Sequence, residues 1–259
     1  MGLGRTLALL VALASAALTV GCSAEASSGA SDTSEDGVAQ AASAVGYVID
    51  DVPGRATGAH CTGTLVSPRI VLTAAHCILS PKEVELAYGA DAAKYGVAFG
   101  IGRVADLRRV RAAKVVVHPG YDPMHGHPTD LAYLVLERPV TEVAPLKVVT
   151  HKERCDYETI GYGPKTRAEA VTDLKSRTLV CTKAGFDTRG FIQGTARDGN
   201  VCFGFGGGPL VAPGETEISG ILSWGEAWCS ETSQRANYFA PLAHPENAPF
   251  VDEALAAAR

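Results

Sequence analysis

Short apolar and β-branched segments recur along the chain, and this is the feature that most limits its fold. Most of them are bounded by Gly, Pro or Asp, which predicts β-strands separated by turns. They lie at residues 47–49, 63–66, 70–73, 113–117, 131–136, 178–182 and 218–224. A single helix is predicted over residues 249–258, where apolar side chains recur at helical spacing and Asn247 is a candidate cap. We therefore expect an all-β protein with one helix at its C-terminal end.

The composition suits one compact unit and argues against several classes of ligand. The chain has 259 residues, of which 46% are hydrophobic, and this is enough for a substantial core. The formal net charge of −5 gives no indication of a nucleic-acid partner. There are no repeats and no metal-cluster spacing, and the glycines at 204–208 lie between a cysteine and a proline, unlike a phosphate loop. We expect no metal, no cofactor and no nucleic acid.

The N-terminal residues have the pattern of an export signal. Arg5 precedes a 15-residue apolar run at residues 6–20, which is shorter than the roughly 20 residues that a membrane-spanning helix needs. The run ends in Leu-Thr-Val-Gly-Cys, which resembles the lipid-attachment box of bacterial lipoproteins and makes Cys22 the lipidated residue. Residues 23–44 are rich in Ser, Ala, Glu and Asp and poor in large apolar residues, as in a flexible tether.

The resulting prediction is a signal peptide over residues 1–22 and a lipoprotein of the cell envelope, with the membrane contacted only through Cys22. The alternative is an ordinary signal-peptide cysteine, with cleavage at a later small residue and a soluble periplasmic or extracellular protein. Cysteine counting bears on this choice, because setting Cys22 aside leaves six of the seven cysteines, which can pair completely.

Several segments carry distinctive residue combinations in a fixed order. Residues 61–77 end in Thr-Ala-Ala-His-Cys, with the histidine at His76, and residues 118–122 read His-Pro-Gly-Tyr-Asp. Asp130 opens Asp-Leu-Ala-Tyr-Leu, and further on come Gly-Tyr-Gly at 161–163, Gly-Phe-Gly-Gly-Gly-Pro-Leu at 204–210 and Ser-Trp-Gly at 223–225. In this order the segments resemble serine proteases of the chymotrypsin and trypsin type over roughly residues 45–258.

The resemblance implies a fold and a set of disulfides. The fold would be two antiparallel six-stranded Greek-key β-barrels with a C-terminal helix, in a protease-like domain over residues 45–259 with the boundary between barrels near 140–150. The bridge beside the family's histidine would join Cys61 with Cys77, and the bridge across its specificity pocket would join Cys202 with Cys229. This leaves Cys155 to pair with Cys181.

The resemblance also assigns roles to individual residues. His76 would be the general base and Asp130 its orienting carboxylate. The backbone N–H groups of Gly204 and Gly206 would form the oxyanion hole. The substrate pocket would contain Asn200, Ser223, Trp224 and Gly225, and an amide at Asn200 would suit a neutral or polar side chain rather than a basic one.

Two residues depart from the family's Gly-Asp-Ser-Gly-Gly-Pro motif. Gly206 stands in place of the nucleophilic serine, and a glycine has no oxygen that could attack a carbonyl. Phe205 stands in place of the aspartate that, in the family, pairs with a newly cut chain end. We therefore expect a monomeric, non-catalytic homologue that binds a protein or peptide ligand. The alternative is an active serine endopeptidase whose nucleophile lies outside the usual motif.

Overall fold

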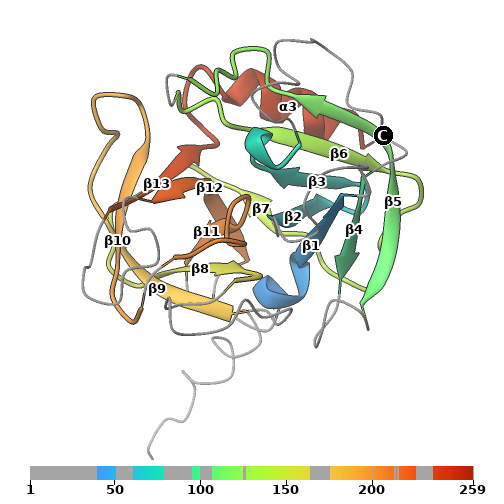
Figure 1. The fold of residues 1–259 in the computed structure, drawn as a ribbon, viewed down its shortest axis with the longest axis horizontal. Helices are drawn as coiled ribbons and strands as arrows, with labels where there is room; N and C mark the ends of the chain where they lie inside the picture. Colours follow the sequence, from blue (N-terminus) through green and yellow to red (C-terminus); the bar gives the residue numbers. More distant parts are fainter. Residues whose placement is uncertain are drawn as a thin grey trace, which may run out of the picture.

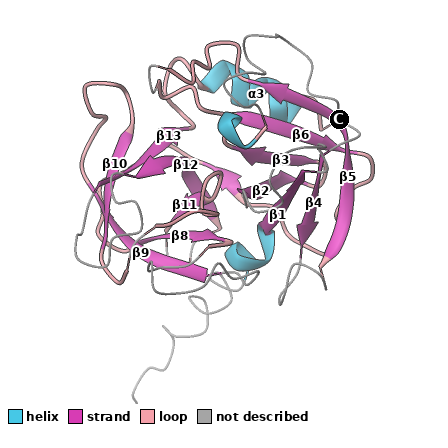
Figure 2. Cartoon of the chain, viewed as in Figure 1, coloured by secondary structure: helices cyan, strands magenta, loops and turns pink. Residues whose placement is uncertain are grey.

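The computed structural model describes residues 40–50, 61–78, 95–99, 107–124, 127–163, 176–199, 201–212, 214, 216–225 and 236–258. Two β-barrels lie side by side, and the C-terminal helix packs beside the first of them (Figure 1). Strands make up most of the regular structure, as the turn-bounded apolar segments predict (Figure 2). Among the described residues, no helix combines the length and the apolar character needed to cross a membrane.

The first barrel is closed and antiparallel, with the strand order β1-β2-β3-β6-β5-β4. Its interior is filled by fully buried aliphatic side chains such as Leu65, Leu72 and Leu134. Its elements are β1 (Val45–Asp50), β2 (Cys61–Ser67), β3 (Ile70–Thr73), the short 3-10 helix η1 (Ala75–Cys77), β4 (Tyr95–Phe99), β5 (Arg108–Val117) and β6 (Ala132–Leu136).

The second sheet also closes on itself. Its strands follow the order β11-β8-β9-β10-β13-β12, and pairing between β11 and β12 completes a six-stranded barrel. A short seventh strand, β7 (Lys147–Val148), adds to β12 in parallel. The barrel strands are β8 (Tyr157–Gly161), β9 (Ser176–Thr182), β10 (Ile192–Ala196), β11 (Pro209–Val211), β12 (Glu217–Gly225) and β13 (Ala236–Pro241). The two six-stranded antiparallel barrels confirm the predicted fold class.

The chain passes from the first barrel to the second at two adjacent residues. The Leu146 N–H donates to Leu65 O of β2 at 2.9 Å, and the Lys147 N–H donates to Thr216 O at 2.8 Å. Residues 40–44, directly before β1, form a helical turn in which Ala41 and Ala44 are buried in the core. The sequence places these five residues in a flexible tether, so the packed structure extends further toward the N-terminus than expected.

The helix α3 (Ala248–Ala256) buries Phe250, Val251 and Ala254 against the first barrel, as its apolar spacing predicts. Asn247 occupies the N-cap position but makes no side-chain capping bond, so its prediction as a cap is wrong. Its side-chain amide instead donates to Pro128 O at 2.9 Å and to Pro241 O at 2.8 Å. Asn247 is fully buried there, and its Oδ1, the atom that would cap the helix, has no hydrogen-bond partner within the described residues.

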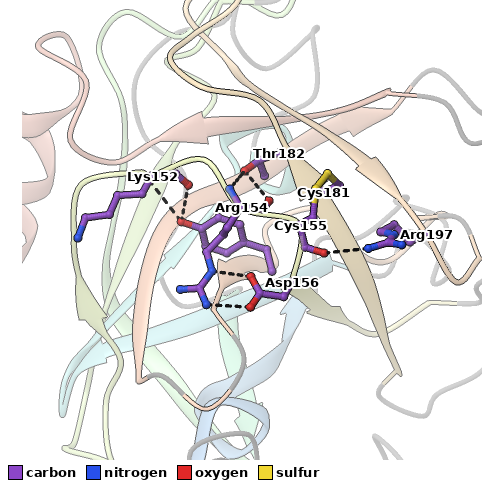
Figure 3. Close-up of polar contacts among 8 residues, drawn as sticks. Lys152, Arg154, Cys155, Asp156, Cys181, Thr182 and Arg197 are labelled. Atoms are coloured by element: carbon purple, nitrogen blue, oxygen red, sulfur yellow. Dashed lines mark hydrogen bonds and ion pairs between the residues drawn. A yellow bond between two sulfur atoms is a disulfide. The ribbon is translucent and has the colours of Figure 1, made fainter.

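Two complete disulfides follow the expected pairing. Cys61 is bonded to Cys77, and Cys155 is bonded to Cys181. The second bridge fastens the loop before β8 to β9, where the Thr182 N–H also donates to Arg154 O at 2.8 Å (Figure 3). Cys202 is disulfide-bonded as well, and its expected partner Cys229 lies outside the described residues, as does Cys22.

Candidate functional site

A histidine, an aspartate and a serine form a hydrogen-bonded network between the barrels. His76 lies on η1 directly after β3, and its Nδ1 is 2.8 Å from Asp130 Oδ2. The His76 backbone N–H donates to the other carboxylate oxygen at 2.9 Å. From β12 of the second barrel, Ser223 Oγ donates to Asp130 Oδ2 at 2.6 Å. His76 and Ser223 lie 54 and 93 positions from Asp130 in the sequence, and both are hydrogen-bonded to its carboxylate.

The carboxylate of this network is buried, whereas the imidazole is accessible. The Asp130 side chain is 8% exposed and that of His76 is 38% exposed. Burial is the largest influence on the pKa of Asp130 and raises it, but the charge and hydrogen bonds of His76, with the Ser223 hydroxyl, outweigh burial and lower this pKa below its usual range. Asp130 therefore stays ionised and holds His76 with Nε2 turned away from the carboxylate.

Gly206 faces the free side of the imidazole. A Cβ atom built on Gly206 would lie 2.7 Å from His76 Nε2 and 3.1 Å from His76 Cε1, which is closer than side chains tolerate. Cys77 Sγ lies 3.6 Å from the same nitrogen. The nitrogen that would accept a proton from a nucleophile therefore contacts a backbone that bears no side chain.

Hydrogen bonds from β2 hold the segment around Gly206. The Thr62 N–H donates to Gly206 O at 2.8 Å, and Thr62 Oγ1 donates to Gly204 O at 2.6 Å. Thr62 Oγ1 also accepts the Tyr162 N–H at 3.1 Å, which joins the first barrel to the end of β8. In turn, Thr62 O accepts a hydrogen bond from Thr73 Oγ1 at 2.7 Å. Thr62 thus connects the segment around Gly206 to the first barrel by hydrogen bonds.

Two backbone N–H groups of this segment are candidates for oxyanion donors. Gly204 has φ +103°, and a Cβ there would lie 1.9 Å from Tyr162 O, so only glycine fits. Within the described part of the chain, the N–H groups of Gly204 and Gly206 donate to no protein acceptor, whereas the Phe205 N–H donates to Cys202 O at 3.2 Å. Gly206 is partly exposed and Gly204 is buried, and both N–H groups are without an acceptor among the described residues.

Phe205 lies in the hydrophobic core of the second barrel. Its side chain is fully buried and belongs to the core of the second barrel together with Tyr157, Val180 and Leu210. No carboxylate occupies this position, and the ring takes its place in the core. Phe205 thus contributes packing to the site rather than charge.

The remaining predicted site residues divide into described and undescribed positions. Ser223 is buried, and Trp224 and Gly225 are partly buried at the end of β12. Asn200 lies outside the described residues. Cys61, His76 and Cys77 bring potential metal-ligand atoms within 4.8 Å of one another, but the two sulfurs are joined as a disulfide and are not thiolates.

Two six-stranded barrels with His76, Asp130 and Ser223 at their junction place the protein in the class of chymotrypsin-like proteins. The family model for trypsin matches residues 34–244, and the chain belongs to this family of trypsin-like serine proteases. Human kallikrein-7 is 29% identical over 198 residues, covering 69% of this chain and 72% of the relative. A trypsin of Saccharopolyspora erythraea is 29% identical over 191 residues, covering 64% of this chain and 75% of the relative.

Solved structures show the same fold. Neuropsin, a serine protease expressed in the limbic system of mouse brain, matches with a TM-score of 0.62 at 20% identity, over 83% of this chain and 96% of that one. Human heparin binding protein matches with a TM-score of 0.63 at 19% identity, over 84% of this chain and 93% of that one. The disulfides and the family membership together indicate an exported protein.

The sequence analysis did not identify two residues at or beside the site, Thr62 and Arg189. Thr62 lies inside a recognised segment, but its role depends on contacts with residues 100 or more positions away. Arg189 contacts the ring of Trp224, with the guanidinium carbon 4.8 Å from the ring centroid. The pattern Asp187-Thr188-Arg189 is the only local sequence sign of this arrangement, because the aspartate positions the arginine.

Proposed function

We propose that this protein is a non-catalytic member of the family that uses the region between the barrels to bind a protein or peptide ligand. The observation that carries this proposal is the contact between Gly206 and His76. The position that supplies the nucleophilic hydroxyl in the family has no side chain, and a Cβ there would lie 2.7 Å from His76 Nε2. A base and its orienting carboxylate without a nucleophile cannot perform acyl transfer.

Three hydroxyl groups near the Gly204–Gly206 segment already donate hydrogen bonds to other groups. Ser223 Oγ donates to Asp130, Thr62 Oγ1 donates to Gly204 O, and Thr73 Oγ1 donates to Thr62 O. Each of these hydrogens would have to leave a buried acceptor before the oxygen could act as a nucleophile, which is unfavourable. This supports the binding function over the alternative of a peptidase with a displaced nucleophile.

Features retained from the family favour a peptide as the ligand. The N–H groups of Gly204 and Gly206 are unused within the described residues, and the half-buried Trp224 extends the surface from Ser223. Backbone donors beside an aromatic side chain suit a polypeptide, which offers carbonyl oxygens and apolar groups in alternation. The protein would act as a monomer, with lipid at Cys22 as its link to the cell envelope.

A labelling experiment tests the absence of catalysis. The purified, disulfide-intact protein should take up no fluorophosphonate probe and should hydrolyse peptide and ester substrates no faster than a His76→Ala variant does. Stoichiometric labelling of any serine would establish the alternative, an active serine peptidase. Binding is measured separately, by fluorescence anisotropy with pools of fluorescein-labelled octapeptides.

A further inference from the structure

Arg189 is stacked against a cluster of aromatic rings beside the site. Its guanidinium carbon lies 4.5 Å from the ring centroid of Tyr238, 4.8 Å from that of Trp224 and 5.7 Å from that of Phe191. Trp224 and Tyr238 are themselves stacked, with centroids 4.1 Å apart. Cation–π contacts with three rings therefore restrict where the guanidinium can lie.

Asp187 fixes the same side chain from the other edge. Asp187 Oδ2 accepts hydrogen bonds from Arg189 Nη2 at 3.0 Å and from Arg189 Nε at 3.2 Å. Asp187 Oδ1 accepts the backbone N–H groups of Arg189 and Phe191, both at 2.9 Å. Asp187 and Arg189 lie in the loop between β9 and β10 (Figure 1). This loop is therefore folded around the Asp187 carboxylate, and the arginine is held before any ligand arrives.

The loop that carries Arg189 contacts residues next to two members of the His76–Asp130–Ser223 network. Trp224, which the guanidinium covers, follows directly after Ser223. A Cβ on Gly190, the next residue, would lie 2.9 Å from Pro128 Cγ, and Pro128 precedes Asp130 by two residues. Arg189 is thus linked to the network through the neighbours of Ser223 and Asp130.

Arg189 also keeps hydrogen-bonding capacity. Its Nη1 has no partner within the described residues, and its side chain is 41% exposed. Arginine presents planar donors that match a carboxylate, and a side chain that is already ordered loses little entropy on binding.

We propose that Arg189 selects an acidic side chain in the bound peptide. The inference rests on the proposed function, because it requires a polypeptide between the barrels. Arg189 Nη1 would donate to a Glu or Asp carboxylate of the ligand, while the ring face of Trp224 stays covered by the guanidinium. A lysine or arginine at that ligand position would face the positive charge and be rejected.

The test compares peptides and variants in parallel. Octapeptide pools with Glu, Gln or Lys fixed at one position in turn are titrated by anisotropy against wild type, Arg189→Gln and Arg189→Lys. Wild type should prefer Glu over Gln at one position by about tenfold, or about 1.4 kcal/mol, and the preference should weaken as salt is raised. Arg189→Gln should remove this preference, so that the variant binds the Glu and Gln pools equally.

Arg154→Gln is the matched control. Arg154 makes the same kind of paired contact with Asp156, and its guanidinium carbon lies 5.6 Å from the Tyr157 ring centroid, in the loop drawn in Figure 3. This variant should keep the preference for Glu. If Arg189→Gln also keeps it, or if wild type binds peptides without it, the inference is wrong while the proposed function stands.

A ligand that reports on Arg189 alone separates the two proposals further. N-acetylglutamate N-methylamide should shift the Arg189 Nε resonance in wild-type protein labelled with nitrogen-15, and its glutamine counterpart should leave the resonance unchanged. If no octapeptide pool binds, the proposed function fails, and this titration decides the role of Arg189 by itself. An identical response to both compounds would overturn that role.

Discussion

Gly161 leaves open the space that Phe205 occupies, since a Cβ atom at position 161 would lie 2.8 Å from Phe205 Cα and 2.9 Å from Phe205 Cδ1. Gly163 is similarly close, with a Cβ there 3.1 Å from Phe205 Cδ2. The aromatic ring is thus fitted between the two glycines of the Gly-Tyr-Gly segment. A residue that would be a buried carboxylate in the resembling proteases is here part of the hydrophobic core.

Replacing Phe205 by aspartate should destabilise the protein strongly. We expect Phe205→Asp to lower the free energy of unfolding by at least about 3 kcal/mol, because it removes a buried ring and introduces a charge into an apolar site. Phe205→Leu, which keeps an apolar side chain, should cost clearly less. Urea unfolding of both variants measures the difference, and equal stability of Phe205→Asp and wild type would show that a counter-charge is available.

Restoring the serine alone should not restore hydrolysis. In Gly206→Ser the new Cβ would force the His76 ring away from a position that is held by its 2.8 Å bond to Asp130. Removing the nucleophile of a Ser-His-Asp triad costs about a millionfold in turnover, and we expect this variant to recover less than about a hundredth of that factor. Ester-hydrolysis kinetics measure it, with Gly206→Ala as the steric control. Turnover at a normal family level would mean that His76 and the oxyanion donors are already arranged for catalysis.

Stability should depend on pH through His118. Burial, the largest influence, lowers the pKa of His118, while its bond to Glu246 O acts in the opposite direction. His118 Nε2 lies 3.2 Å from Glu246 O, and His118 Nδ1 accepts the Gly120 N–H at 3.0 Å, so the neutral ring satisfies both contacts. Because the folded-state pKa is below the unfolded value of about 6.5, the stabilisation is present above that pH and is lost as the pH falls through the folded pKa.

The measurement for this prediction is the free energy of unfolding between pH 8 and pH 5, for wild type and for His118→Gln. Wild type should lose more stability than the variant over this range. The comparison isolates His118 because carboxylates titrate in both proteins. Parallel curves for the two proteins would rule out a contribution from this histidine.

The anchor is tested by one substitution. If Cys22 carries lipid, wild type should fractionate with membranes and require detergent for extraction, whereas Cys22→Ala should be soluble, because the acyl chains supply the membrane affinity. Cell fractionation followed by immunoblotting measures the distribution. A wild-type protein that is already soluble would favour the alternative of an ordinary cleaved signal peptide.

All the predicted segments overlap observed strands, but other strands were not predicted, including β4 and β13, whose residues are all buried. The predicted strand at 218–224 differs from β12 by one residue at each end. Strand β5 begins five residues before the predicted segment at 113–117, because exposed Arg108 and Arg111 alternate with buried Val110 and Ala112. Strand β10 was missed for the same reason, since only alternate residues face the core.

From the sequence, the residues of the candidate site could be predicted only by their motifs. Composition and periodicity cannot bring His76 to Asp130, because His76 follows β3 and Asp130 precedes β6, and only the pairing of these two strands brings them together. The motifs identify both residues and the missing hydroxyl at Gly206. They carry no information on the 2.7 Å approach to His76 or on the packing of Arg189 against Trp224, because each depends on where folding places separate segments.

Thr62 has a consequence for how a ligand meets this protein. Its hydrogen bonds to Gly204 O, to Gly206 O and from the Tyr162 N–H all cross between the barrels, so the barrels cannot move apart without breaking contacts at the site itself. The surface between the barrels is therefore formed when the domain folds, before any ligand binds. We expect recognition to resemble rigid docking, in which little reorganisation of the protein opposes association.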